Sequence, residues 1–217
     1  MNIELNNLAY GNLNHDYNLL LNADNEFTKL KDSFLDFPYP QIEETKLEIH
    51  NLISQQESAI KSKNWEKQYT FMQNADKNLD KLFINFYLKN ELILDKEFLT
   101  KLKLDISGLV MQLKDFYQRA RPYQVAYYTE QNLVPFNSAS ANTPSYPSGH
   151  SVQAYFIGLV ESFKYPHKEK EIKKFCTMIA KSRETMGVHY ESDTDFGKTI
   201  AIALSKHPTI IDLYFKK

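Results

Sequence analysis

Apolar residues recur along this chain at helical spacing, and the pattern predicts a protein built from helices. Residues three and four positions apart lie on one face of an α-helix, so a stripe at that spacing marks the side that packs inward. Neither an alternating strand pattern nor an internal repeat is visible. We therefore expect an all-α, single-domain helical bundle over 1–217. The predicted helices span 43–61, 65–78, 79–88, 96–119, 148–163, 169–186 and a last segment from about 193.

The N-terminal segments carry a weaker pattern. Residues 1–25 are rich in Asn and Leu, which predicts an irregular arm with a short helix near 17–21. Apolar residues at helical spacing follow over 27–35, and Pro38 and Pro40 end that segment. The 43–61 helix is expected to pack one apolar side inward. That side consists of Leu47, Ile49, Leu52 and Ile53.

The second half is more strongly patterned. Pro122 is expected to end the 96–119 helix, because the residue before a proline is pushed out of helical geometry. The stretch 123–147 is polar and predicts a long loop, which in a compact domain is usually functional or disordered. The 148–163 helix is apolar on most faces and should be central and buried. Ser192 followed by Asp195 resembles a capping box. The stripe expected inside the 96–119 helix is Phe98, Leu99, Leu102, Ile106, Leu109, Val110, Leu113, Phe116 and Tyr117.

Composition narrows the class of protein. With 217 residues, 42% hydrophobic and 24% charged, the chain can form one sizeable core as a globular domain. A net charge of -1 gives no global attraction to nucleic acid or to an anionic membrane. Cys176 is the sole cysteine, which excludes an intrachain disulfide. No signal peptide is seen, and no apolar run approaches the roughly 18 residues that suggest a membrane span. We expect a cytoplasmic or otherwise soluble protein.

The positive charges are nearly all lysine, and the three arginines are Arg119, Arg121 and Arg183. Arg183 continues the apolar stripe of its helix, where a charge is costly unless it is paired. Its partner is either a protein carboxylate in a buried salt bridge or a ligand anion between helices. Lys114 and Arg121 lie two helical turns apart and can point to one side, although such a pair is also typical of a solvated face.

A second candidate lies where the long loop enters the 148–163 helix, at Pro147, Ser148, Gly149 and His150. Free N–H groups and a positive partial charge make a helix N-terminus a natural seat for phosphate. Gly149 permits a close backbone approach, and Ser148 can cap the helix or bind an oxygen. The simpler interpretation is an ordinary helix start, but a cation such as protonated His150 opposes the helix dipole there.

His189 and Asp193 form the third candidate. Gly187 is expected to end the preceding helix, and Asp193 can reach one ring nitrogen of His189 and leave the other free to attack. A lone histidine near an aspartate is more often structural. The two histidines and their scattered carboxylates lack a tight ligand spacing, so no metal site is predicted.

Taken jointly, these pieces resemble the superfamily of type 2 phosphatidic acid phosphatases, class A non-specific acid phosphatases and vanadium-dependent haloperoxidases. Every position of the three-part motif is filled in order and at the right spacing. The local sequence around Arg119 and over 145–150 is most similar to the class A acid phosphatases. The motif core is expected at 96–205, and the length and composition of the residues before it suggest an N-terminal helical layer at 1–95 packed on that core. Glu191 departs from that class, and a carboxylate near the phosphate would repel it. The motif positions are Lys114, Arg121, Pro122, Pro147, Ser148, Gly149, His150, Ser182, Arg183, His189 and Asp193.

The resemblance implies an active site between helices of a central bundle. His189 would attack phosphorus and form a phosphohistidine, Asp193 would hold that imidazole, and His150 would protonate the leaving oxygen and then activate water. An acidic optimum follows, since His150 must be protonated while His189 is not. No metal or other cofactor is expected, and vanadate should inhibit. The phosphate-binding residues would be Lys114, Arg121, Ser148, Gly149 and Arg183.

The expected partner is a small phosphomonoester, with no nucleic acid and no membrane span, and a homo-oligomer is allowed. One alternative within the same superfamily is a haloperoxidase that keeps vanadate on His189 as a cofactor, although those enzymes are much longer. A membrane lipid phosphatase is disfavoured by the missing spans. A non-catalytic phosphate-binding or structural module on the same scaffold is disfavoured by the intact residue set.

Overall fold

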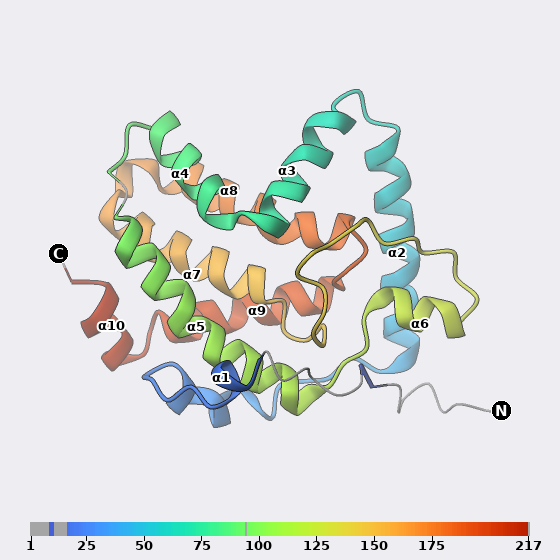
Figure 1. The fold of residues 1–217 in the computed structure, drawn as a ribbon, viewed down its shortest axis with the longest axis horizontal. Helices are drawn as coiled ribbons and strands as arrows, with labels where there is room; N and C mark the ends of the chain where they lie inside the picture. Colours follow the sequence, from blue (N-terminus) through green and yellow to red (C-terminus); the bar gives the residue numbers. More distant parts are fainter. Residues whose placement is uncertain (1–8, 11–16, 94, 217) are drawn as a thin grey trace.

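The computed structural model describes residues 9–10, 17–93 and 95–216 (Figure 1). Within them only an isolated bridge between Ala9 and Arg119 has β character, so the predicted all-α fold is confirmed. No helix of the described part has the length and apolar character needed to cross a membrane. The elements are α1 (Asn18–Leu21), η3 (Thr28–Phe34), α2 (Ile42–Ile60), α3 (Trp65–Lys77), α4 (Leu79–Lys89), α5 (Lys96–Tyr117), α6 (Pro122–Tyr128), α7 (Gly149–Lys164), η4 (Pro166–Lys168), α8 (Glu169–Thr185), α9 (Glu191–Leu204) and α10 (Pro208–Tyr214).

Helix α7 is the centre of the fold, as its apolar faces predict. It runs between α8 and α9, and α5 crosses it (Figure 1). Val152, Phe156 and Val160 are fully buried on it. Gly197 lets α9 approach closely, since a Cβ there would lie 2.9 Å from Ser151 Cβ and 3.0 Å from the Ser148 carbonyl oxygen. The N-terminal ends of α7 and α9 are thereby brought together.

The N-terminal elements pack on the helices that carry the motifs. Helix α1 and the 3-10 helix η3 lie on α5, while α3 lies on α8 and α2 contacts both α8 and α6 (Figure 1). The short helix near 17–21 is thus confirmed as α1, and the helical spacing over 27–35 forms a 3-10 helix. The expected arm over 1–25 otherwise falls largely outside the described residues.

Several boundaries differ from the prediction. Helix α5 stops at Tyr117 because Gln118 adopts a left-handed conformation with φ 49°, before Pro122 is reached. Pro122 instead occupies the first turn of α6, where its missing N–H costs nothing, so the expected loop over 123–147 was wrong at its start. Helix α10 was not predicted.

Some expected contacts were also wrong. Leu47 and Phe116 are 62% and 53% exposed, because each lies at the margin of its apolar stripe rather than on its inward face. The capping box of Ser192 and Asp195 does not form. Helix α9 begins earlier, and Asp193 accepts a hydrogen bond from the Tyr190 backbone N–H at 3.0 Å.

Candidate active site

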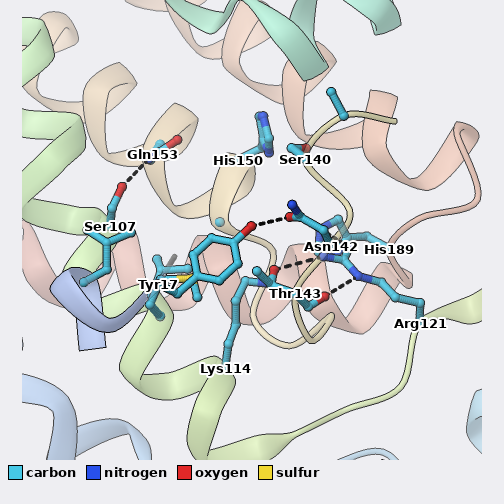
Figure 2. Close-up of a pocket in the computed structure, with 15 residues that line it drawn as sticks. Tyr17, Ser107, Lys114, Arg121, Ser140, Asn142, Thr143, His150, Gln153 and His189 are labelled. Carbon is cyan, nitrogen blue, oxygen red and sulfur yellow. Dashed lines mark hydrogen bonds between the residues drawn. The ribbon is translucent and has the colours of Figure 1, made fainter. Parts of the chain in front are cut away.

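A cavity of about 270 Å³ lies where α5, the 139–143 loop, the start of α7 and the turn before α9 meet. Figure 2 shows residues from these four segments around it. The three motif segments are far apart in the sequence, yet each contributes to the lining. Five of the predicted site residues line the cavity, namely Lys114, Arg121, Gly149, His150 and His189.

His189 is held in one tautomer by its two neighbours. Its Nδ1 lies 3.0 Å from Asp193 Oδ2, and its Nε2 lies 3.0 Å from Arg121 Nη1. A guanidinium can only donate, so Nε2 must present its lone pair and Nδ1 must carry the proton. Burial, Arg121, Lys114 and Arg183 all lower the pKa of His189 well below its ordinary value. The side chain therefore has the protonation state of a nucleophile.

A sharp turn delivers His189 to the cavity. Helix α8 ends at Thr185, and Gly187 follows with φ 71°, a left-handed conformation that favours glycine. A Cβ on Gly187 would lie 2.7 Å from Gln56 Nε2. The Val188 carbonyl then accepts a hydrogen bond from Arg121 Nη1 at 2.7 Å, which fixes the backbone beside the imidazole.

Arg121 and Lys114 are almost fully buried cations on the cavity wall. Arg121 donates Nε to the Thr143 carbonyl at 2.7 Å, and Lys114 donates to the Pro144 carbonyl. Burial lowers the pKa of Arg121 to about 10, and burial together with Arg121 lowers the pKa of Lys114. Two cations confined in one apolar setting favour binding of an anion, which relieves their mutual repulsion.

The start of α7 holds His150 and Ser148 in different settings. His150 lines the cavity, whereas Ser148 is fully buried and its Oγ accepts a hydrogen bond from Ser151 Oγ at 2.9 Å. Ser148 thus acts as the helix cap, and its backbone N–H donates to the Asp193 carbonyl at 3.0 Å. Burial first, and then Arg183, lowers the pKa of His150 to about 3.

Arg183 forms the buried salt bridge that a charge on its stripe requires. Its Nη1 lies 2.7 Å from Asp76 Oδ1, with both side chains fully buried. Asp76 also accepts hydrogen bonds of 2.6 Å from Ser138 Oγ, Ser140 Oγ and the Ala139 N–H, so it ties the cavity loop to α3. Although burial opposes its ionisation, these partners keep the pKa of Asp76 below its usual value. Arg183 does not line the cavity, but its buried Nε–H has no acceptor among the described residues.

Glu191 does not lie where the sequence placed it. Its carboxylate is 2.9 Å from Lys181 Nζ, and the residue lines a separate hollow with Phe196 and Tyr39. The expected repulsion between Glu191 and a phosphate in this cavity therefore lacks a structural basis.

Two carboxylates that contact the site residues were missed. Asp76 pairs with Arg183, and Glu48 lies 2.9 Å from Arg119, which in turn pairs with Asp193 at 2.6 Å. Both lie on helices rich in polar residues. An acidic side chain in such a helix is normally expected to face the solvent, so the sequence did not single out either residue. Among the described residues, no group of three or more His, Cys, Asp or Glu side chains could hold a metal ion.

Comparison with known proteins adds an independent result. The family model of the PAP2 superfamily matches residues 102–214, just over half of the chain. A non-specific acid phosphatase of Salmonella typhimurium is 30% identical over 98 residues, which cover 45% of this chain and 39% of that protein. A non-specific acid phosphatase of Providencia stuartii is 32% identical over 88 residues, or 41% of this chain and 35% of that protein. The matches thus span less than half of these relatives.

Proposed function

The chain belongs to the PAP2 superfamily, and from that premise we propose that it is a metal-independent acid phosphatase which hydrolyses small phosphomonoesters. The observation that carries the proposal is the 3.0 Å contact between His189 Nε2 and Nη1 of the cavity-lining Arg121, because a guanidinium can only donate and Nε2 must therefore be the unprotonated nitrogen. The relatives named as non-specific acid phosphatases support the same reaction class.

The chemistry has two steps. His189 Nε2 attacks phosphorus, a P–N bond forms, and the bond from phosphorus to the leaving oxygen breaks as His150 protonates that oxygen. His150 then removes a proton from water, whose oxygen displaces the imidazole and releases phosphate. Asp193 accepts from Nδ1 and stabilises the positive imidazole in between. Fixed cations can neutralise the phosphoryl oxygens, a contribution that metal ions make in many other phosphatases.

Arg121 has to change partners during the first step. Its Nη1 donates to the lone pair of His189 that would attack. A phosphate oxygen is a stronger, charged acceptor, so substrate binding should draw the guanidinium onto the substrate and free Nε2. In this way the nucleophile is exposed when an anion is present to receive it.

The protonation of His150 should depend on the substrate. Burial, the buried Arg183 and the cavity cations Lys114 and Arg121 hold the pKa of His150 at about 3. A bound phosphate adds negative charge beside the imidazole and raises that pKa, because an opposite charge stabilises the protonated form. Activity should therefore be greatest at acid pH, where the bound complex keeps His150 charged.

Uncharged side chains also line the cavity, so it can accommodate an uncharged leaving group. Leu20, Met111 and Gln153 are among them, and Tyr17, also in the lining, donates a hydrogen bond to Asn142 Oδ1 at 2.5 Å (Figure 2). Together with a volume of about 270 Å³, this lining favours small esters.

The test is hydrolysis of p-nitrophenyl phosphate by the wild type and by His189→Ala. Loss of the nucleophile should lower kcat by roughly 10³-fold or more. His167→Ala, at an exposed position, is the matched control and should retain activity. A folded His189→Ala protein with wild-type turnover would refute the proposal.

A further inference from the structure

Behind Asp193, on the side away from the cavity, lies a buried guanidinium to which the mechanism above assigns no role. Arg119 has a side chain only 3% exposed, and its Nη1 lies 2.6 Å from Asp193 Oδ1. The other carboxylate oxygen, Oδ2, is the one that meets His189 Nδ1 at 3.0 Å. One carboxylate is thus shared between a permanent cation and the catalytic imidazole.

Arg119 is itself held on three sides. Its Nη1 donates to Ser192 Oγ at 2.7 Å, and its Nη2 donates to Glu48 Oε2 at 2.9 Å. The guanidinium also stacks on the Tyr190 ring, 3.8 Å from the centroid. Although burial opposes its charge, Asp193, Tyr190 and Glu48 keep the pKa of Arg119 above its ordinary value. Arg119 therefore stays positively charged at neutral and acid pH.

Glu48 comes from α2, outside the residues that the family model matches. Its Oε1 accepts from the Ser192 backbone N–H at 2.6 Å, and its Oε2 accepts from Ser192 Oγ at 2.9 Å. The N-terminal part of the chain therefore supplies the carboxylate that balances Arg119 and anchors the first turn of α9.

We propose that Arg119 is a positioning residue that shares the Asp193 carboxylate with His189, and that Glu48 sets how strongly it does so. The kinetic part of this inference rests on the proposed phosphatase function. Arg119 would orient Asp193 and offset part of its charge, so that His189 stays neutral at the acid pH that His150 requires.

The electrostatic surroundings of His189 make the direction of the effect definite. The charged or titratable groups around it are Lys114 on α5, Arg121 at the start of α6, His150 on α7, Arg183 on α8 and Asp193 on α9, with Arg119, Tyr190 and Glu48 behind Asp193. Removing the Arg119 charge strengthens the pull of Asp193 on a proton at His189. Removing the Glu48 charge leaves the positive charge of Arg119 without its second carboxylate partner. Arg119 then offsets more of the Asp193 charge, and the attraction of Asp193 for a proton on His189 becomes weaker.

Two substitutions should therefore act in opposite directions. In Arg119→Gln the acid limb of the kcat/KM profile, where His189 becomes protonated, should move to higher pH by roughly one unit, the low end of the effect of a neighbouring charge. In Glu48→Gln the same limb should move to lower pH. Arg119→Lys keeps the positive charge and should return the acid limb to its wild-type pH. Its kcat should stay reduced, because an ammonium cannot make the paired hydrogen bonds of the planar guanidinium. Glu57→Gln, on the exposed face of α2, is the matched control and should leave the limb in place.

A readout without turnover separates this inference from the proposed function. The ¹⁵N resonances of the His189 imidazole can be titrated in each variant, with and without inorganic phosphate. Opposite shifts in the two variants support the inference even if p-nitrophenyl phosphate is not hydrolysed. Shifts in one direction, or none in either variant, overturn it even in an active enzyme. If Arg119→Gln fails to fold, Glu48→Gln decides: a downward shift supports the inference, and no shift or an upward one overturns it.

Discussion

The Nη1 atom of Arg121 lies 3.0 Å from Nε2 of His189, so the candidate nucleophile and a candidate phosphate ligand are hydrogen-bonded to each other. The same guanidinium also donates to the Val188 and Thr143 carbonyls, both at 2.7 Å. Arg121 therefore sets the position of the imidazole as well as its tautomer.

Replacing Arg121 by lysine should test this double role. An ammonium keeps the positive charge but cannot reach three acceptors in one plane. We expect Arg121→Lys to lower kcat/KM for p-nitrophenyl phosphate by roughly 10² to 10³-fold, as for loss of one transition-state donor. Steady-state kinetics on a variant with unchanged circular dichroism would measure it. Wild-type kcat/KM in that variant would show that charge alone suffices.

Vanadate and a chelator should have different effects on the proposed enzyme. Vanadate adopts the five-coordinate geometry of phosphoryl transfer, so it should compete with substrate for the cavity cations. Incubation with EDTA should leave activity unchanged. Initial rates at several substrate concentrations provide both results. Indifference to millimolar vanadate, or activity lost in EDTA and restored by a metal, would contradict the metal-free account.

The helices were predictable where the apolar pattern is strong and local. The apolar faces of α7 and the stripe of α8 gave nearly correct bounds, because burial on one helix face is recorded within a few turns of sequence. The predicted role of Pro122 was wrong because a proline can either end one helix or occupy the first turn of the next. Gln118 separates the two helices by adopting a left-handed conformation. Glutamine has no special preference for that conformation, so the sequence does not predict the break at this position.

The site shows the same division. The placement of His150 and of His189 beside Asp193 follows from short segments, and these residues could be proposed from the sequence. Asp76 and Glu48 could not be proposed, since each meets its arginine through contacts 107 and 71 residues apart, respectively, and such pairing leaves no local trace. The charge balance of the site is therefore a tertiary property.

The ion pair between Asp76 and Arg183 should be important for stability. Breaking a buried pair leaves one charge uncompensated, which costs about 3–5 kcal/mol. We expect Asp76→Asn to lower the free energy of unfolding by about that amount in urea titrations. Asp80→Asn is the matched control on α4, because Asp80 is half exposed beside Lys103 and its loss should cost at most about 1 kcal/mol. Equal losses in both variants would contradict this interpretation.

Glu184, next to Arg183, should make stability depend on pH. Burial raises its pKa to about 7, and Thr194 and Lys181 offset only part of this. The folded protein therefore binds a proton that the unfolded chain has released, and stability falls as pH rises from 4.5 to about 7. The difference amounts to about 3 kcal/mol. Thermal unfolding of Glu184→Gln across this range should lack that component.

The control for this prediction is Glu171→Gln, which removes an exposed carboxylate from the same helix. It should keep the wild-type pH dependence. An unchanged pH dependence in Glu184→Gln would show that another group is responsible.

The central claim is that His189 carries the phosphoryl group. Rapid acid-free quenching followed by mass spectrometry of the peptide that contains His189 tests it most directly. The account predicts a phosphate on His189 in the wild type and none in His189→Ala. In His150→Ala, assayed with an activated ester, more phosphorylated His189 should accumulate, because without His150 the dephosphorylation step is slowed. A phosphate on any other residue, or turnover by His189→Ala with no phosphorylated peptide, would contradict the account.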